Sequence, residues 1–184
     1  CPTARSKNFN YFLSIGNIEP RKNHLTAARA IAKLNRKLNA DFKYMVVGRE
    51  LFQSDRIVAQ LRAVLGENLI VTGCLSNSDK LNWLSNATAH IFPSSYEGFG
   101  LPALESYHLK IPTLLANNSS LTELAVDPWQ LFDTFSSDEL FGKLDDIVSK
   151  ASPSALVNAQ LDFSQHYNWD VHVNQAFKIY SSLR

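Results

Sequence analysis

Residues 89–105 read AHIFPSSYEGFGLPALE and set the pattern for the whole chain. The first four residues form an apolar run typical of a buried strand, and Pro93 follows it directly. A loop with two glycines comes next, and Pro102 suits the first turn of a helix, where a missing N–H costs little. The stretch therefore predicts a strand, a glycine-containing loop and a helix in direct succession.

The same alternation of short apolar runs and helical patterns extends in both directions. Further strands are expected at residues 11–15, 42–47, 69–72, 113–116 and 131–132. Helices are expected at residues 23–38, 54–65 and 79–84, and then at 138–150, 153–166 and 170–183. Strands separated by helices imply right-handed crossovers and a parallel sheet covered on both faces. The expected fold is one doubly wound, Rossmann-like α/β domain over residues 1–184, with residues 137–184 largely helical.

Composition and charge exclude several classes of protein. The 184 residues carry a formal net charge of +1 and contain no long run of Lys or Arg, so a nucleic-acid partner is not expected. No stretch approaches about 20 apolar residues, so no membrane-spanning segment is expected. The five histidines are scattered and no metal site is expected. One disulfide between Cys1 and Cys74 stays open, and Cys74 is otherwise expected to be a small buried hydrophobe.

Two carboxylates flank the glycine loop, Glu97 on the loop and Glu105 about one turn into the helix. In open parallel sheets, ligands bind beyond the carboxyl ends of the strands, which is where this loop is expected. The positive end of a helix favours a phosphate, and carboxylates accept hydrogen bonds from hydroxyl groups. The alternative is that both glutamates are solvated surface charges. The combination with the glycines favours a site for a ligand with phosphates and hydroxyls.

These residues resemble a known family. The stretch 97–105, EGFGLPALE, is similar to the E-x7-E motif of retaining GT-B-fold glycosyltransferases, the large group that includes sucrose synthases and bacterial mannosyltransferases. The stretch 15–23, IGNIEPRKN, resembles the family's other loop, a Gly followed shortly by Pro-x-Lys. The resemblance spans most of the chain. It implies that the chain is the second, donor-binding half of a GT-B enzyme and that the N-terminal acceptor domain is absent from it.

The resemblance also implies a role for each matching residue. Lys22 would neutralise the diphosphate of a nucleotide-sugar donor, with Arg21 as a helper, and Glu97 would face the donor sugar. Lys22 and Glu97 are thus the expected catalytic residues, while Glu105 would hold the ribose hydroxyls and Ser76 would border the base. The alternative for Lys22 alone is a solvated lysine near a helix N-terminus. The expected donor-binding set is Gly16, Asn17, Arg21, Lys22, Ser76, Glu97, Gly98, Phe99, Gly100, Leu101 and Glu105.

The chain departs from the family pattern at four positions. Asn17 stands where many relatives carry a second basic residue, so Arg21 or backbone amides would meet part of the diphosphate charge. Lys110 replaces a glycine that ends the helix, and that end is expected to close differently. Tyr107 and His108 replace small residues that usually pack closely.

The resemblance implies a hexosyltransferase of bacterial surface polysaccharide or lipopolysaccharide synthesis. GDP-mannose is the first candidate donor and a UDP-hexose the alternative, with no further cofactor. The acceptor, a saccharide or lipid-linked saccharide, would be bound through the missing domain. The enzyme would be cytoplasmic and peripheral at the inner membrane face. The isolated chain is expected to bind donor weakly and to transfer negligibly.

Other classes of function fit the sequence less well. A dinucleotide-dependent oxidoreductase would need a Gly-x-Gly-x-x-Gly turn after the first strand, which residues 16–21 do not provide. A phospho-acceptor signalling domain would want acidic residues where Ser14 and Ile15 stand. A non-catalytic nucleotide-binding or scaffold domain of the same fold remains the alternative.

Overall fold

The computed structural model describes residues 9–51, 54–149, 154–167 and 169–182. Its centre is a six-stranded parallel sheet in the order β3-β2-β1-β4-β5-β6. The strands are β1 (Tyr11–Ile15), β2 (Lys43–Val47), β3 (Leu69–Val71), β4 (Ala89–Phe92), β5 (Thr113–Ala116) and β6 (Leu131–Phe132). The expected fold class, a doubly wound Rossmann-like α/β domain with C-terminal helices, is confirmed.

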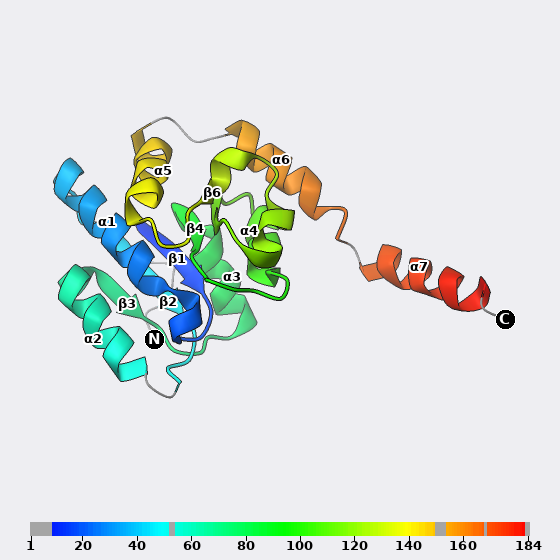
Figure 1. The fold of residues 1–184 in the computed structure, drawn as a ribbon, viewed down its shortest axis with the longest axis horizontal. Helices are drawn as coiled ribbons and strands as arrows, with labels where there is room; N and C mark the ends of the chain where they lie inside the picture. The colour runs from blue at the N-terminus through cyan, green and yellow to red at the C-terminus, as the bar shows by residue number, and fades with distance from the viewer. Residues whose placement is uncertain (1–8, 52–53, 150–153, 168, 183–184) are drawn as a thin grey trace.

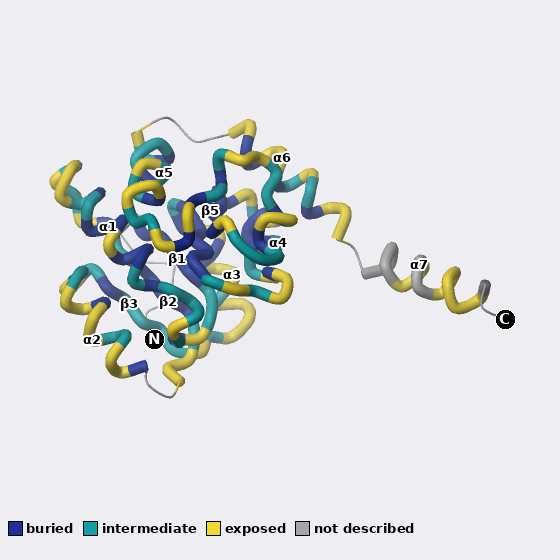
Figure 2. Tube along the Cα trace, viewed as in Figure 1, coloured by how far each residue is buried: buried dark blue, intermediate teal, exposed yellow. Residues whose placement is uncertain are grey.

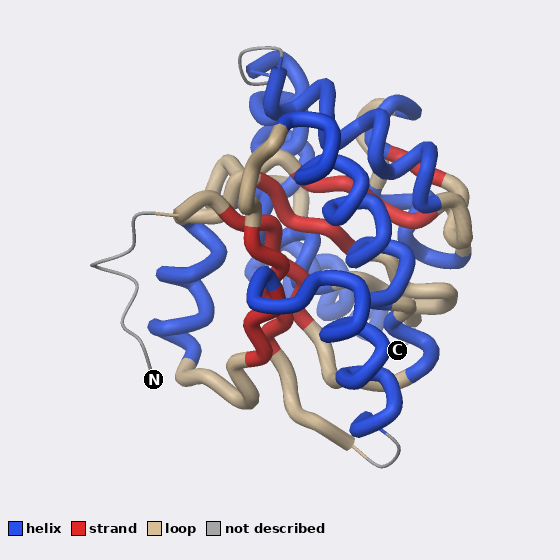
Figure 3. The backbone as a smooth tube through the Cα atoms, turned by 90° about the vertical axis from the view of Figure 1, so that its left-hand side faces the viewer, coloured by secondary structure: helices blue, strands red, loops and turns tan. Residues whose placement is uncertain are grey.

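Helices cover both faces of the sheet (Figures 1 and 3). On one face, α1 packs against α2 and α5, and on the other, α4 contacts α3 and α6. The helices are α1 (His24–Leu38), α2 (Ser54–Leu65), α3 (Asn77–Ser85), α4 (Leu101–His108), α5 (Ser137–Ser149), α6 (Ser154–Ser164) and α7 (Trp169–Ser182). Helix α7 extends away from the body of the domain (Figure 1). Residues 150, 153 and 183, at the ends of expected helices, lie outside the described residues.

Side chains along each strand alternate between the two faces, because successive residues of a strand point in opposite directions. Phe12 and Tyr44 join the larger apolar cluster, which also holds buried residues of α1, α2 and α5. Leu13 and Met45 join a second cluster with Trp83 of α3. All of these strand side chains are buried, and the buried strands fill the middle of the domain (Figure 2). The sheet is therefore anchored from both sides.

The strand order places the carboxyl ends of β1 and β4 side by side. From β1 the chain moves outward to β2 and β3, then returns to β4 and moves outward the other way. The loop after β1 leads to α1 on one face, and the loop after β4 leads to α4 on the other. At such a reversal the loops after the two strands meet, and the position between them, here called the crevice, is where ligands usually bind in such sheets. The crevice lies between the loop of residues 15–23 and the loop of residues 93–101.

Two expectations about local structure are wrong. Cys74 is exposed rather than buried, because β3 ends at Val71 and the residues after it lie on the surface. The C-terminal end of α4 was expected to close differently from a helix that ends at glycine. It instead closes in the same way, because Lys110 adopts the left-handed conformation with a φ of 59°. The backbone N–H groups of Lys110 and Ile111 then donate to the carbonyls of Tyr107 and Ser106.

The larger residues at positions 107 and 108 are accommodated by contacts with later segments. Tyr107 is fully buried, and its hydroxyl donates to the carbonyl of Leu124 at 2.9 Å. The ring of Tyr107 also meets Phe163 of α6 edge-on, and His108 Nδ1 lies 3.2 Å from the hydroxyl of Ser164. These residues therefore attach α6 to α4. Four short 3-10 helices, η2 (Pro20–Lys22), η3 (Gly66–Asn68), η4 (Ser119–Leu124) and η5 (Pro128–Gln130), were not expected.

Among the described residues, no helix combines the length and apolar character needed to cross a bilayer. Cys1 lies outside the described residues.

Candidate functional site

An ion pair between Lys22 and Glu97 occupies the crevice between β1 and β4. Lys22 Nζ lies 2.6 Å from Glu97 Oε1, although the two residues are 75 positions apart in the sequence. Both side chains are largely buried, with exposed fractions of 12% and 11%. The structure thus brings together the two residues expected to be catalytic. It also shows that the anion beside Lys22 is a carboxylate of the chain itself.

Arg21 extends the same charge cluster toward solvent. Its Nη1 lies 3.1 Å from Glu97 Oε2, and its Nη2 lies 2.6 Å from Glu19 Oε1. The two loops are also joined through the backbone, because Ser95 N donates to the carbonyl of Arg21 at 2.8 Å. Arg21 therefore lies beside the Lys22–Glu97 pair, with its side chain 40% exposed.

Glu97 is held in its ionised form. Burial alone would raise the pKa of Glu97, but the hydrogen bond from Lys22 and the charges of Lys22 and Arg21 outweigh it. The pKa of Glu97 is therefore lower than its ordinary value. The stability that these contacts contribute is present above the ordinary pKa of a glutamate and is lost as the pH falls through the lowered value. At neutral pH the carboxylate accepts hydrogen bonds and cannot donate them.

Gly16 and Gly48 shape the floor beneath Lys22. A Cβ at Gly16 would lie 2.9 Å from Lys22 Cε, so the lysine side chain rests directly on this glycine. A Cβ at Gly48 would lie 2.0 Å from the carbonyl oxygen of Gly16. The hydrogen bond from Gly16 N to the carbonyl of Val47, 2.9 Å long, holds the loop after β1 against the end of β2. Gly48 is therefore required by a close approach of backbone atoms, and Gly16 by its φ of 150°, which side chains rarely tolerate.

The loop after β5 supports the backbone of the glycine loop. Glu97 N donates to Ser119 Oγ at 3.0 Å, and Ser120 Oγ lies 3.0 Å and 3.1 Å from the carbonyl oxygens of Glu97 and Phe99. Ser119 adopts a left-handed backbone conformation with a φ of 44°. Sequence reasoning did not single out these serines. The polar run NNSS at 117–120, directly after a buried strand, is the signal that could have found them.

Gly98 borders open space, and the helix α4 begins just after it. A Cβ at Gly98 would meet no atom within 4 Å, and its φ lies outside the left-handed region. The fold itself therefore places no demand for a glycine here. Gly100, with a φ of 113°, precedes α4, whose N-terminus has no side-chain cap. Uncapped N–H groups at a helix start favour an anion.

Replacing Gly98 with alanine should separate ligand binding from stability. The added methyl group meets nothing in the chain, so the melting temperature should change by no more than about 2 °C. If a sugar or phosphate lies against this backbone, nucleoside diphosphate affinity should fall about tenfold. Calorimetric titration and thermal melting of the variant measure both quantities. The matched control is Gly142→Ala in α5, where a Cβ also meets nothing. Equal affinities for G98A and the parent chain would contradict the assignment of this loop.

Glu105 lies on the first turns of α4 and is paired with a residue that sequence reasoning missed. Lys80 Nζ on α3 lies 2.7 Å from Glu105 Oε1. Glu105 and Glu97 therefore have different partners, and each is tied to its own cation.

Four other residues of the expected donor-binding set have the following surroundings. Asn17 is exposed, and its Oδ1 accepts a hydrogen bond from Arg49 N at 3.3 Å. Ser76 caps α3, its Oγ accepting from Asp79 N at 3.1 Å, which gives it a structural role. Phe99 contacts Tyr167 edge-on with ring centroids 5.6 Å apart, and Leu101 is 61% exposed at the start of α4.

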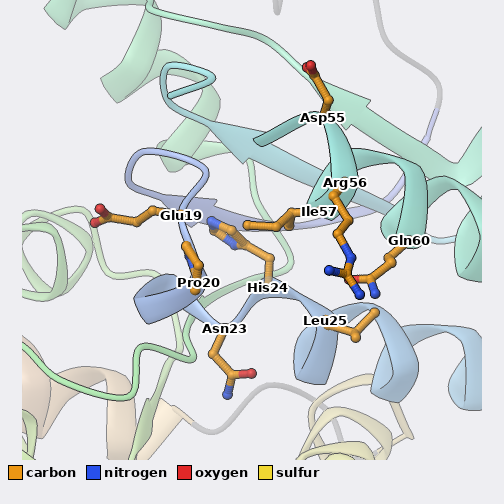
Figure 4. Close-up of a pocket in the computed structure, with 9 residues that line it drawn as sticks. All are labelled: Glu19, Pro20, Asn23, His24, Leu25, Asp55, Arg56, Ile57 and Gln60. Atoms are coloured by element: carbon orange, nitrogen blue, oxygen red, sulfur yellow. The ribbon is translucent and has the colours of Figure 1, made fainter. Parts of the chain in front are cut away.

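A hollow of about 640 Å³ lies next to the charged crevice, between the loop after β1, the start of α1 and the first turns of α2, and Glu19 borders both (Figure 4). Its lining includes Arg56 and Gln60 of α2 and none of the expected donor-binding residues. His24 also lines it, and burial together with the charge of Lys22 lowers the pKa of His24 to about 4. His24 is therefore neutral at pH 7. Within the described ranges, no three His, Cys, Asp or Glu residues are grouped to hold a metal ion.

The strand order and the charged crevice at the point where it reverses define the chain as a Rossmann-like α/β domain. The model of the glycosyl transferases group 1 family matches residues 2–160, and the chain belongs to this family.

Comparisons with individual proteins agree with this family. The chain is 25% identical over 175 residues to the O-antigen chain mannosyltransferase B of Escherichia coli, covering 94% of this chain and 46% of that protein. It is 29% identical over 116 residues to the serotype-specific mannosyltransferase WbdA of Escherichia coli, covering 62% of this chain and 14% of that protein. The crystal structure of HepE from Anabaena, in complex with UDP and glucose, matches with a TM-score of 0.83 at 20% identity, covering 95% of this chain and 49% of that one. The chain thus spans less than half the length of each of these proteins.

Proposed function

We propose that this chain forms the donor site of a retaining hexosyltransferase. The enzyme would move a hexose from a nucleoside diphosphate sugar to a saccharide or lipid-linked acceptor. The observation that carries the proposal is the Lys22–Glu97 ion pair, 2.6 Å long, at the carboxyl ends of β1 and β4. Membership of the glycosyl transferases group 1 family supports it.

The proposed chemistry requires positive charge where the leaving diphosphate develops negative charge. An ammonium has three N–H donors, and Glu97 takes one of them, so Lys22 can hold Glu97 and a phosphate oxygen together. The backbone N–H groups at the start of α4 would contribute to the same anion site. Glu97, fixed by Lys22 and Arg21, would accept hydrogen bonds from the sugar hydroxyls.

Mannose is the sugar we favour, with GDP-mannose as the donor. The two Escherichia coli relatives named above are both mannosyltransferases, and one acts on O-antigen chains by its name. A UDP-hexose is the alternative, supported by the UDP and glucose in the Anabaena structure. A role in bacterial surface polysaccharide synthesis follows from the same relatives. On this proposal the whole enzyme acts in the cytoplasm, at the inner face of the membrane, on an acceptor aligned by a second domain.

Thermal melting against a panel of nucleotides tests the proposal. GDP, UDP and ADP, each with the matching sugar nucleotide, are added to the chain. At ten times the dissociation constant, a ligand adds about 1.4 kcal/mol, which raises the melting temperature by about 3–6 °C. GDP and GDP-mannose should give the largest shift. A largest shift with UDP-sugars would favour the alternative donor, and no shift with any nucleotide would contradict the donor site.

Replacing Glu105 with alanine tests where the nucleotide lies. If Glu105 holds the ribose, the affinity for the best nucleoside diphosphate should fall about tenfold to a hundredfold, because a hydrogen bond to a charged acceptor is lost. Isothermal titration calorimetry gives the dissociation constants. The matched control is Glu67→Ala, an exposed glutamate in η3, where no change is expected. Unchanged affinity in E105A would remove Glu105 from the site.

A further inference from the structure

Lys80 and Glu105 form a bridge between α3 and α4. The contact of 2.7 Å joins Lys80 Nζ to Glu105 Oε1, and the two side chains are 20% and 33% exposed. Exposed ion pairs contribute little to stability because solvent screens them. This pair is mostly shielded, and it joins two helices at the same side of the crevice.

The two carboxylate oxygens of Glu105 have different surroundings. Oε1 accepts from Lys80, whereas Oε2 is shielded from solvent and has no hydrogen-bond partner within the described part of the chain. A shielded carboxylate oxygen without a donor costs free energy. Because an ionised carboxylate can only accept, the missing partner must be a donor such as a hydroxyl group. Glu105 therefore presents one occupied and one unoccupied acceptor.

Helix α3 holds Lys80 in a defined place. Ser76 caps the helix, and Lys80 N donates to the carbonyl of Ser76 at 2.9 Å in its first turn. Trp83 and Leu84, three and four residues further on, are buried at 3% and 0% exposure. Because one face of α3 is fixed in the core, the lysine stem starts from a fixed backbone. The bridge to α4 is thus set by the packing of the domain.

We propose that Lys80 is a positioning residue for Glu105, and this proposal rests on the proposed function. Lys80 holds Oε1 and so turns Oε2 toward a ribose hydroxyl of the donor nucleotide. A fixed, otherwise unpartnered acceptor strongly disfavours an analogue that lacks the hydroxyl. Lys80 therefore sets the preference of this site for ribose over 2′-deoxyribose, without itself having to touch the sugar.

The test measures dissociation constants for GDP and 2′-deoxy-GDP, and for UDP and 2′-deoxy-UDP, by calorimetry on the 184-residue chain. The parent chain should prefer the ribonucleotide about tenfold or more. Lys80→Met should reduce this preference to within about threefold. Lys80→Arg, which keeps a cation beside Glu105, should restore most of it. Lys37→Met removes an ion pair of 2.6 Å with Asp145, between α1 and α5, and should leave the preference unchanged.

A double-mutant comparison separates positioning from simple stabilisation. In a Glu105→Gln background, adding Lys80→Met should change neither affinity further, because the two residues act as one unit. If K80M lowers both affinities equally and lowers the melting temperature, Lys80 is only structural and the proposal is overturned. The positioning role of Lys80 is also overturned if K80M keeps the full preference for ribonucleotides while E105Q loses it. That result leaves the donor site intact. A parent chain that binds GDP or UDP without any ribose preference overturns the role of Lys80 and leaves the donor site intact, whereas a parent chain that binds no nucleotide contradicts the donor site itself.

Discussion

Replacing Lys22 with methionine is expected to lower the affinity of the chain for a nucleoside diphosphate about thirtyfold to a hundredfold. Methionine has a similar length but no charge, so the phosphate loses a charge-assisted hydrogen bond of about 2–3 kcal/mol. The effect is enlarged because Glu97, held 2.6 Å away in the parent chain, would then face the diphosphate with only Arg21 to balance it. Calorimetric titration with GDP and UDP measures the change.

Two further variants show whether the charge of Lys22 is responsible. Lys22→Arg keeps a cation in the crevice and should retain more affinity than K22M. Lys37→Met loses an ion pair on the α1–α5 side and should bind as the parent chain does. If the affinity of K22M for the nucleotide lies within about threefold of that of the parent chain, Lys22 pairs with Glu97 but does not bind the diphosphate.

Replacing Gly48 with alanine should destabilise the chain by about 3 kcal/mol or more and lower its melting temperature by about 6–12 °C. The added Cβ would lie 2.0 Å from the carbonyl oxygen of Gly16 and 2.4 Å from its carbon. These are backbone atoms, so no rotamer change can relieve the clash. The loop after β1 must move, and Lys22 rests on that loop. Nucleotide affinity should therefore fall along with stability.

Gly73→Ala provides the matched control for G48A. Gly73 has a φ of 68°, but a Cβ there meets nothing within 4 Å. Its replacement should cost only the left-handed strain of a non-glycine residue, about 1–2 kcal/mol. Thermal melting compares the two variants. If G48A and G73A lower the melting temperature equally, the loop after β1 can move without loss of stability. That result would contradict a close and rigid contact between Gly16 and the end of β2.

Local patterns were sufficient to predict the elements that build the sheet. The strands at 11–15, 89–92 and 113–116 have the predicted bounds, because each is a short apolar run followed by a glycine, proline or polar residue. The meeting of Lys22 and Glu97 agrees with the expectation that both loops follow strand ends. The strand order itself was not predicted, and it is what places β1 beside β4.

Features that depend on long-range packing could not be predicted in the same way. The pair Lys80–Glu105 depends on how α3 and α4 cross the sheet, which no sequence spacing encodes. The left-handed Lys110 contradicts the local preference for glycine, and it persists because hydrogen bonds around it close α4. Cys74 is exposed because β3 is only three residues long, one shorter than the apolar run indicated.

Nuclear magnetic resonance of the backbone amides, during titration with GDP and with UDP, tests the central claim most directly. The claim is that the crevice between β1 and β4 holds the donor nucleotide. We expect amide shifts at Gly16, Lys22, Gly98 and Leu101, while Gly66 in η3 stays unchanged. Shifts confined to residues of the hollow beside α2, such as Arg56 and Gln60, would place the nucleotide elsewhere and contradict the claim.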